Sequence, residues 1–379
     1  MSVTANKLKR TSLVVMGAAV TAAAMASAAL PASATQNREA PVNPAGYIVK
    51  TFSPVGTESA PDDIARLGDS IYVSYQNGVG PLGEPSAAGA AASTIQQYGL
   101  NGTPGKSWQV TGKVDGLTAD PAHNRLLLTA NEDGNSSIST LTPDQPKPLT
   151  TYAYSGLTHG GGTDAISVND GTILVSASAP ADTTGPAAYS VDLQGTTAKL
   201  TPLFGDNAMA TAMATAANGN HTGQPESLAL TDPDSNTIVP DSAPRFKNAF
   251  MLDAQADQQL IFASSPGTGH QSLQTLAVAQ PLDDTVFAAH TGQTLLVTDP
   301  KDNKVFSVTG PFKAGQAVST VVPDAAPAYL ATLDLTTGAL TPIPELAAIH
   351  PKGLAFTGQA ADKSEGHEDS RLQDGNQTH

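Results

Sequence analysis

Residues 115–128 read Asp-Gly-Leu-Thr-Ala-Asp-Pro-Ala-His-Asn-Arg-Leu-Leu-Leu, and this stretch decides the fold because the chain repeats its plan. An Asp opens a short apolar strand, a polar turn follows, and a second strand rich in leucine or β-branched residues comes next. Residues 62–73, 164–175 and 284–297 follow the same plan. Self-similarity of this kind marks a repeat fold, in which each copy is one structural unit.

The spacing of the copies predicts the architecture. Successive copies recur roughly every 50 residues, close to the ~40–45 residues of a four-stranded propeller blade. Strand patterns separated by turn dipeptides fill residues 47–356. A closed ring of blades removes the strand edges that so many short strands would otherwise expose. We therefore predict an all-β chain that forms a β-propeller of four-stranded blades.

The sequence determines the number of blades less directly than it determines the fold. The length of the strand-rich span favours seven blades, and the clearest copies support six as the alternative. The first strand, near Tyr47, is expected to pair with C-terminal strands and so to close the ring.

The two ends differ in composition from the repeat region. Lys7, Lys9 and Arg10 precede an apolar, alanine-rich stretch, and a small-residue cleavage site follows at 32–34. This pattern predicts that residues 1–34 are a secretory signal peptide and that residues 35–46 are an N-terminal linker. A membrane anchor fits less well, because Ala, Ser and Thr insert weakly into a bilayer. Residues 47–357 are the predicted single propeller domain, and residues 358–379 are a predicted disordered tail.

Composition excludes several classes of function. The chain has no cysteine, which removes thiol catalysis and cysteine metal sites. Its formal net charge is −15, and loss of the three basic residues of the signal makes it −18. An acidic surface repels phosphates and anionic lipid, so no nucleic acid is expected as a partner. We expect a secreted, extracellular monomer with no membrane span in the mature chain.

One part of the repeat resembles a known family. Residues 124–131, followed by the strand pattern at 136–141, are similar to the YVTN-type and WD40-like repeats of secreted bacterial propeller proteins. The resemblance covers most of the mature chain and implies the propeller fold. It implies no single function, because propellers host lectins, lactonases, quinoproteins and scaffolds.

The repeated Asp is the strongest candidate for chemistry. In a propeller the first strand of each blade lines the central channel, so equivalent residues meet at one place. A ring of carboxylates suits a hard cation such as Ca²⁺. The predicted metal ligands are Asp62, Asp115, Asp164 and Asp284. In the alternative interpretation, each Asp caps a turn or accepts a hydrogen bond from a nearby backbone N–H.

Four residues next to inner strands are predicted to contact a ligand: His159, Asp164, His350 and Lys352. His159 precedes a run of three glycines that ends two residues before Asp164, and glycine lets a backbone approach a ligand closely. Lys352 takes the place of the Asp in the last copy. There its ammonium would supply an internal counter-charge and make a metal unnecessary.

Three functions stay open. The chain has no Gly-x-Ser-x-Gly nucleophile motif and no metal-ligand spacing of histidines. This favours a non-enzymatic binding or scaffold protein that presents the channel mouth and loops to an extracellular ligand or protein. The alternatives are a calcium-dependent, lactonase-like hydrolase, whose Asp ring holds a cation that polarises a carbonyl, and a structural protein of the cell envelope.

Overall fold

The computed structural model describes residues 46–53, 56–158, 160–213 and 222–357. No α-helix occurs in these ranges, which contain strands and two short 3₁₀ turns, η1 (Pro121–His123) and η2 (Pro344–Leu346). The all-β prediction is therefore confirmed. The predicted signal peptide, nearly all of the predicted linker and the predicted tail lie outside the described residues, so those assignments stay predictions.

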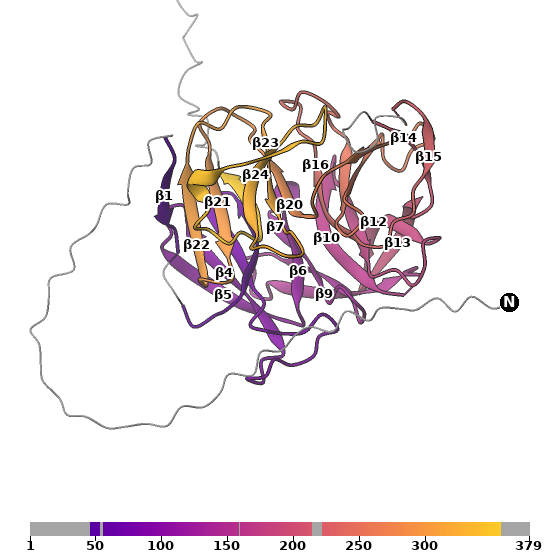
Figure 1. Cartoon of the computed structure of the whole chain (residues 1–379). Coiled ribbons are helices and arrows are strands. Elements are labelled where there is room, and N and C mark those ends of the chain that lie inside the picture. The colour runs from indigo at the N-terminus through magenta and orange to yellow at the C-terminus, as the bar shows by residue number, and fades with distance from the viewer. Residues whose placement is uncertain (1–45, 54–55, 159, 214–221, 358–379) are drawn as a thin grey trace, which may run out of the picture. The chain divides into compact units, whose positions relative to one another are not determined.

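Three antiparallel groups of four strands follow one another along the first half of the chain (Figure 1). The first group contains β2 (Pro61–Leu67), β3 (Ser70–Tyr75), β4 (Ala92–Gly99) and β5 (Pro104–Thr111). The second contains β6 (Val114–Asp120), β7 (Arg125–Ala130), β8 (Ser137–Leu141) and β9 (Leu149–Ser155). The third contains β10 (Gly162–Asn169), β11 (Thr172–Ser178), β12 (Pro186–Gln194) and β13 (Thr197–Gly205). A parallel pairing of β13 with β9 joins the second and third groups into one eight-stranded sheet.

A fourth group adds two strands to the same plan. It contains β16 (Pro233–Ile238), β17 (Phe250–Ala254), β18 (Gln259–Ser264) and β19 (Ser272–Ala277). The two added strands are β14 (Met209–Ala212) and β15 (Pro225–Ser227). Because β14 runs parallel to β19 and pairs with β15, this sheet has six strands.

The last two sheets are interleaved in sequence. One contains β20 (Leu282–Phe287), β23 (Ala317–Val321), β24 (Tyr329–Leu333) and β25 (Leu340–Pro342). The other contains β1 (Ile48–Thr51), β22 (Lys304–Thr309), β21 (Thr294–Asp299) and β26 (Leu354–Thr357). The fourth copy of the repeat, residues 284–297, is thus not a hairpin like the other three. Its first strand pairs with β23, and its second pairs with β22 and β26.

The first strands of these groups form a closed cycle. Among the described residues, β2 contacts β6, β6 contacts β10, β10 contacts β16, β16 contacts β20, β20 contacts β26, and β26 contacts β2. These six strands are called the inner strands below. Each group therefore presents one strand to a common centre, as the propeller prediction requires.

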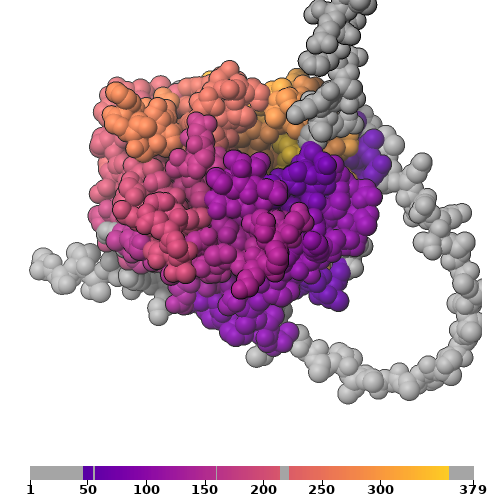
Figure 2. Space-filling view, turned by 180° about the vertical axis from the view of Figure 1, so that it is seen from behind, coloured from indigo at the N-terminus to yellow at the C-terminus, as the bar shows by residue number. Residues whose placement is uncertain are grey.

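The two ends of the described chain meet in one sheet. Strand β1 pairs with β22 from Ile48 opposite Thr309 to Thr51 opposite Phe306. Figure 2 shows the meeting on one face, where indigo and violet atoms of the early chain lie beside orange and yellow atoms of the late chain. The prediction that the first strand closes the ring by pairing near the C-terminus is confirmed.

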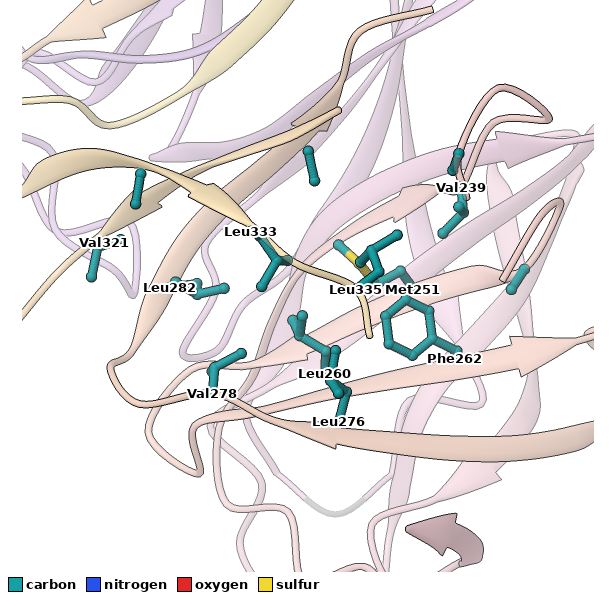
Figure 3. Close-up of a cluster of buried hydrophobic side chains, with 14 residues drawn as sticks. Val239, Met251, Leu260, Phe262, Leu276, Val278, Leu282, Val321, Leu333 and Leu335 are labelled. Atoms are coloured by element: carbon teal, nitrogen blue, oxygen red, sulfur yellow. The ribbon is translucent and has the colours of Figure 1, made fainter. Parts of the chain in front are cut away.

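Hydrophobic side chains fill the spaces between neighbouring groups. Figure 3 shows one such cluster, in which Met251, Leu260 and Phe262 of the fourth group point toward Leu333 of the β20 sheet and Leu335 just beyond β24. Similar clusters of buried residues occupy the other junctions between adjacent groups. Full burial of one such aliphatic or aromatic side chain contributes about 1.5–3 kcal/mol, so these junctions hold the ring together.

Candidate functional site at the channel mouth

Five of the inner strands carry a β-bulge at their acidic residues. The register with the second strand shifts between Pro61 and Ile64 in β2, between Val114 and Gly116 in β6, and at the matching places in β10, β16 and β20. A bulge adds a residue to one strand and re-aims its side chain. The residues at these bulges include Asp62, Asp63, Asp115, Asp164, Asp234 and Asp283.

The sixth inner strand, β26, has a lysine just before it instead. Lys352 precedes Gly353, whose backbone N–H donates a hydrogen bond of 2.7 Å to Thr298 Oγ1. A Cβ atom on Gly353 would lie 2.3 Å from the carbonyl oxygen of Asp62. The backbone of β26 therefore approaches β2 as closely as only glycine permits.

A hydroxyl group opposite the bulge ties neighbouring inner strands together. Thr298 Oγ1 on β21 donates to the carbonyl oxygen of Asp62 at 2.5 Å. Thr129 on β7 and Ser176 on β11 donate in the same way to the carbonyl oxygens of Asp164 and Asp234. These bonds fix the acidic residues of one group against the second strand of the preceding group in the ring.

Carboxylates from these bulges line one cavity of about 360 Å³. Four residues of the predicted metal ring lie there, together with the predicted ligand residue Lys352: Asp62, Asp115, Asp164 and Asp284. The structure adds four acids that the sequence prediction missed: Asp63, Glu132, Asp234 and Asp283. The prediction that the repeated Asp residues meet at one place thus describes the geometry, while their role stays a prediction.

The predicted ligand residue His350 is not in this cavity. His350 lies outside its lining, where its backbone N–H donates to Asp299 Oδ2 at 2.8 Å and its Nε2 is 2.7 Å from Lys301 Nζ. The carboxylate of Asp299 also accepts the backbone N–H of Asp302 at 2.8 Å. His159 lies outside the described residues.

Two lysines offset part of the negative charge. Lys352 Nζ lies 2.6 Å from Asp283 Oδ1 and 3.8 Å from Asp62 Oδ1. Lys113, which the sequence prediction did not include, lies 2.7 Å from Asp115 Oδ1 and is also paired with Glu132. The expectation that Lys352 supplies an internal counter-charge matches this geometry.

Two other acids bind backbone groups of the next inner strand. Asp63 Oδ2 accepts the N–H of Leu117 at 2.7 Å, and Asp284 Oδ2 accepts the N–H of Leu354 at 2.7 Å. The shared contact makes Asp284 the equivalent of Asp63, and leaves Asp283 as the equivalent of Asp62. The carboxylate of Asp284 thus makes the backbone contact that the alternative interpretation of the repeated Asp described.

Burial raises the pKa of the carboxyls in the cavity. It raises the pKa of Asp62 to about 6, against the lowering effect of Lys352, and that of Asp284 to about 7. The pKa of Asp164 also lies well above its usual range, first because of burial and then because of Asp234, with which it shares a side-chain hydrogen bond. Two hydrogen-bonded carboxyls hold a proton between them, so this pair carries less than its full charge.

Among the described residues of the lining, two buried oxygen atoms that can only accept hydrogen bonds lack a donor. Asp115 is 8% exposed, and its Oδ2 has no hydrogen-bond partner among the described residues. The Oδ1 atom of Asn236 is likewise unpartnered in the part of the chain that the structure describes. Buried acceptors are normally satisfied, so these two atoms point to a donor that a ligand brings.

The sequence contained weak indications of some of the acids that the prediction missed. The stretch around Asp232 and Pro233 was recognisable as a weak copy of the repeat, and its carboxylate in the cavity is Asp234, two residues on. The doublet Asp283-Asp284 repeats Asp62-Asp63 and could have set the alignment. Nothing in the local sequence marks Lys113 or Glu132, which lie just before and just after the two strands of the repeated phrase.

Comparison with known proteins gives likeness in fold. No protein-family model matches the sequence, and no curated protein sequence matches it. Among solved structures, the chain is similar to the periplasmic gluconolactonase of Pseudomonas aeruginosa, with 8% identity, a TM-score of 0.48, and coverage of 82% of this chain and 98% of that one. It is also similar to the WD40 β-propeller domain of Doa1, with 13% identity, a TM-score of 0.38, and coverage of 78% and 71%.

A third similar structure is a protein of unknown function from Bacteroides caccae, with 9% identity, a TM-score of 0.46, and coverage of 81% of this chain and 89% of that one. Within the described ranges, no helix has the length and apolar character that a membrane crossing requires. The cycle of antiparallel sheets described above has the propeller arrangement that the sequence resemblance implied, and the chemistry of the site has to be argued from its own residues.

Proposed function

We propose that the chain is a secreted, non-enzymatic binding protein whose channel mouth holds a positively charged group of an extracellular ligand. The observation that carries this proposal is the repeated geometry of the inner strands. Five of them bring a carboxylate from a bulge into one cavity, and the sixth brings Lys352. A cavity of about 360 Å³ is within the usual size range of small-ligand sites.

The charge balance supports a cation. Eight carboxylates line the cavity, and ion pairs with Lys113 and Lys352 offset two of them. Arg66 also lines the cavity, where its Nε donates to Gly68 at 2.9 Å and its guanidinium lies 3.9 Å from Asp69. Clustered like charges in a buried site repel one another, and a bound cation relieves that repulsion.

We further propose that the propeller has six four-stranded blades, in place of the seven that chain length favours. Each inner strand begins one blade, and the cycle of contacts from β2 through β26 back to β2 has six members in the described residues. Six hydrophobic clusters fill the junctions, one for each pair of neighbours. The extra residues per blade lie in loops and in β14 and β15.

A hydrolase stays the second candidate, because of one observation. The carboxyls of Asp164 and Asp234 share a hydrogen bond in the cavity, and burial raises the pKa of both. A pair of carboxyls in which one holds a proton and the other does not can act as general acid and general base. Hydrolysis of a small lactone by wild type, lost in Asp164→Asn and in Asp234→Asn, would favour this candidate over the binding protein.

Thermal unfolding with added cations tests the proposed function. A cation in the channel mouth should raise the unfolding midpoint by about 2 °C or more at roughly a hundredfold excess over its Kd. The panel is CaCl₂, MgCl₂, n-butylammonium chloride and n-butylguanidinium chloride, with NaCl at equal ionic strength as the reference. The double variant Asp164→Asn with Asp234→Asn should lose the response, and Asp192→Asn, an exposed acid on β12, should keep it.

Equal midpoints for wild type under every condition of the panel would overturn the proposal. A response that is the same in wild type and in the double variant would also overturn it, because the cation would then bind elsewhere.

A further inference from the structure

The negative charge in the channel mouth is unevenly compensated. Lys352 lies beside Asp283 and Asp62, and Lys113 lies beside Asp115 and Glu132. Among the described residues, no ion pair within 4.0 Å joins Asp164 or Asp234 to a lysine or an arginine. The side of the cavity formed by β10 and β16 is therefore the side open to an added cation.

The unpartnered acceptors of the cavity lining stand on β16 and on β6, which neighbours β10. Asp115 stands on β6, the neighbour of β10, and its buried Oδ2 has no donor among the described residues while its Oδ1 is paired with Lys113. Asn236 stands on β16, and its side-chain nitrogen donates to the carbonyl oxygen of Ala165 at 2.7 Å. Because a carbonyl only accepts, the nitrogen must face Ala165, and the Oδ1 atom of Asn236 is left without a donor.

These acceptors are spread too widely for one bare metal ion. Within the described residues, the group of three potential ligands whose atoms lie within 4.8 Å of one another is Asp299, Asp302 and His350, outside the cavity. Ca²⁺ holds each oxygen ligand at about 2.3–2.6 Å, so three carboxylates that do not converge to this degree would have to move to share one ion. A guanidinium group presents five N–H donors over a wider planar fork, and it pairs with carboxylates in a bidentate manner.

We infer that the ligand group in the channel mouth is an alkylguanidinium, seated between Asp115, Asp164, Asp234 and the amide oxygen of Asn236. This inference rests on the proposed function and specifies its ligand class. The group could reach the site as a free small base or as the arginine side chain of a peptide. In both cases the planar cation supplies the N–H donors that the buried acceptors lack, and its charge offsets the acids that no lysine pairs with.

Isothermal titration calorimetry at fixed ionic strength tests the inference. The probes are n-butylguanidinium, its neutral analogue n-butylurea, CaCl₂, and arginine capped by an N-acetyl group and a C-terminal amide. We expect n-butylguanidinium to bind wild type at least about tenfold more tightly than n-butylurea or Ca²⁺, since hydrogen bonds between charged partners contribute most. Equal binding of capped arginine would indicate a peptide side chain, and its failure alone would indicate a free base.

Isosteric variants locate the site. Asp164→Asn and Asp234→Asn should each weaken n-butylguanidinium binding about tenfold or more, whereas the exposed Asp192→Asn should leave it unchanged. Asp115→Asn gives a further test if either of the first two does not fold, which circular dichroism would show.

The outcomes separate this inference from the proposed function. Binding of Ca²⁺ that depends on the ring, with no binding of n-butylguanidinium, would overturn the inference and leave the proposed function standing. Failure of every cation to bind would overturn both. Binding of n-butylguanidinium that is unaffected by all three ring variants would place the site elsewhere and overturn the inference.

Discussion

At the scale of single residues, the position opposite each bulge decides how neighbouring strands are joined. Ser74 and Ser176 stand opposite the bulges of β2 and β10, and Asp253 stands at the matching place opposite the bulge of β16. Asp253 is fully buried, and neither of its carboxylate oxygens has a partner among the described residues. Burial, with Asp283 nearby, raises the pKa of Asp253 well above its usual range. Asp253 thus has a carboxyl group at the position where β3 and β11 have a hydroxyl group.

Asp253→Ser is expected to stabilise the protein above neutral pH. The raised pKa means that the folded state keeps a proton that the unfolded chain releases near pH 4. Stability from this group is therefore full below that pH and falls as pH rises toward the folded pKa. The variant should gain about 1 kcal/mol or more in free energy of unfolding at pH 8, and less at pH 4.5.

Urea unfolding at the two pH values measures this difference. A variant that is less stable than wild type at pH 8 would contradict this prediction, because it would show that Asp253 has a favourable partner.

Lys352 holds two acids of the channel mouth together. Lys352→Met removes the ammonium 2.6 Å from Asp283 and leaves that carboxylate and Asp62 with a larger uncompensated charge. The side chain of Lys352 is 41% exposed, so solvent screens part of this loss. We expect the free energy of unfolding to fall by about 1 kcal/mol without ligand, measured by denaturant titration. Lys50→Met, at an exposed lysine on β1, is the control and should change stability little; equal effects would contradict a role for the ion pair.

At the scale of the strands, the repeat in the sequence predicted most of the inner surface. Asp62, Asp115 and Asp164 each open a copy, and each lies in the cavity. The bulges could not be predicted, because they depend on how two strands pair rather than on the residues of one. This is why Asp284 was aligned with Asp62 although it makes the contact of Asp63.

The close approach of β26 to β2 depends on a glycine. Gly353→Ala would place a methyl group 2.3 Å from the carbonyl oxygen of Asp62, so one of the two strands would have to move. We expect a loss of about 1–3 kcal/mol in free energy of unfolding. Gly269→Ala is a matched control, because no atom lies within 4 Å of the added methyl group, and it should change stability by no more than about 0.5 kcal/mol.

Equal unfolding midpoints for these two alanine variants would contradict the described packing of β26 against β2.

At the scale of the whole molecule, the ring is closed by pairings between distant segments. Strand β1 supplies the outer strand of the sheet that ends with β26, and β21 and β22 are inserted in sequence between β20 and its partner β23. Closure by β1 was predictable, since a strand pattern stands alone before the first copy. The interleaving was not, because the loop at 288–293 connects two strands with turn-like residues and leaves their partners unspecified.

The N-terminal sequence predicts that the protein is exported from the cell. Residues 1–34 have the basic start, the apolar stretch and the Ala-Ser-Ala site of a signal peptide. N-terminal sequencing of protein recovered from the culture medium should begin near Thr35. An intact Met1 in the extracellular protein would contradict this prediction.

The mouth of the channel is proposed to be the site of an alkylguanidinium cation. A crystal structure of the mature protein grown with n-butylguanidinium tests it most directly, because it shows where the cation lies. We predict a planar group in the cavity, with its nitrogen atoms within about 3.2 Å of the carboxylates of Asp164 and Asp234. A cavity that contains only water, with the cation absent or bound at a surface acid elsewhere, would contradict it.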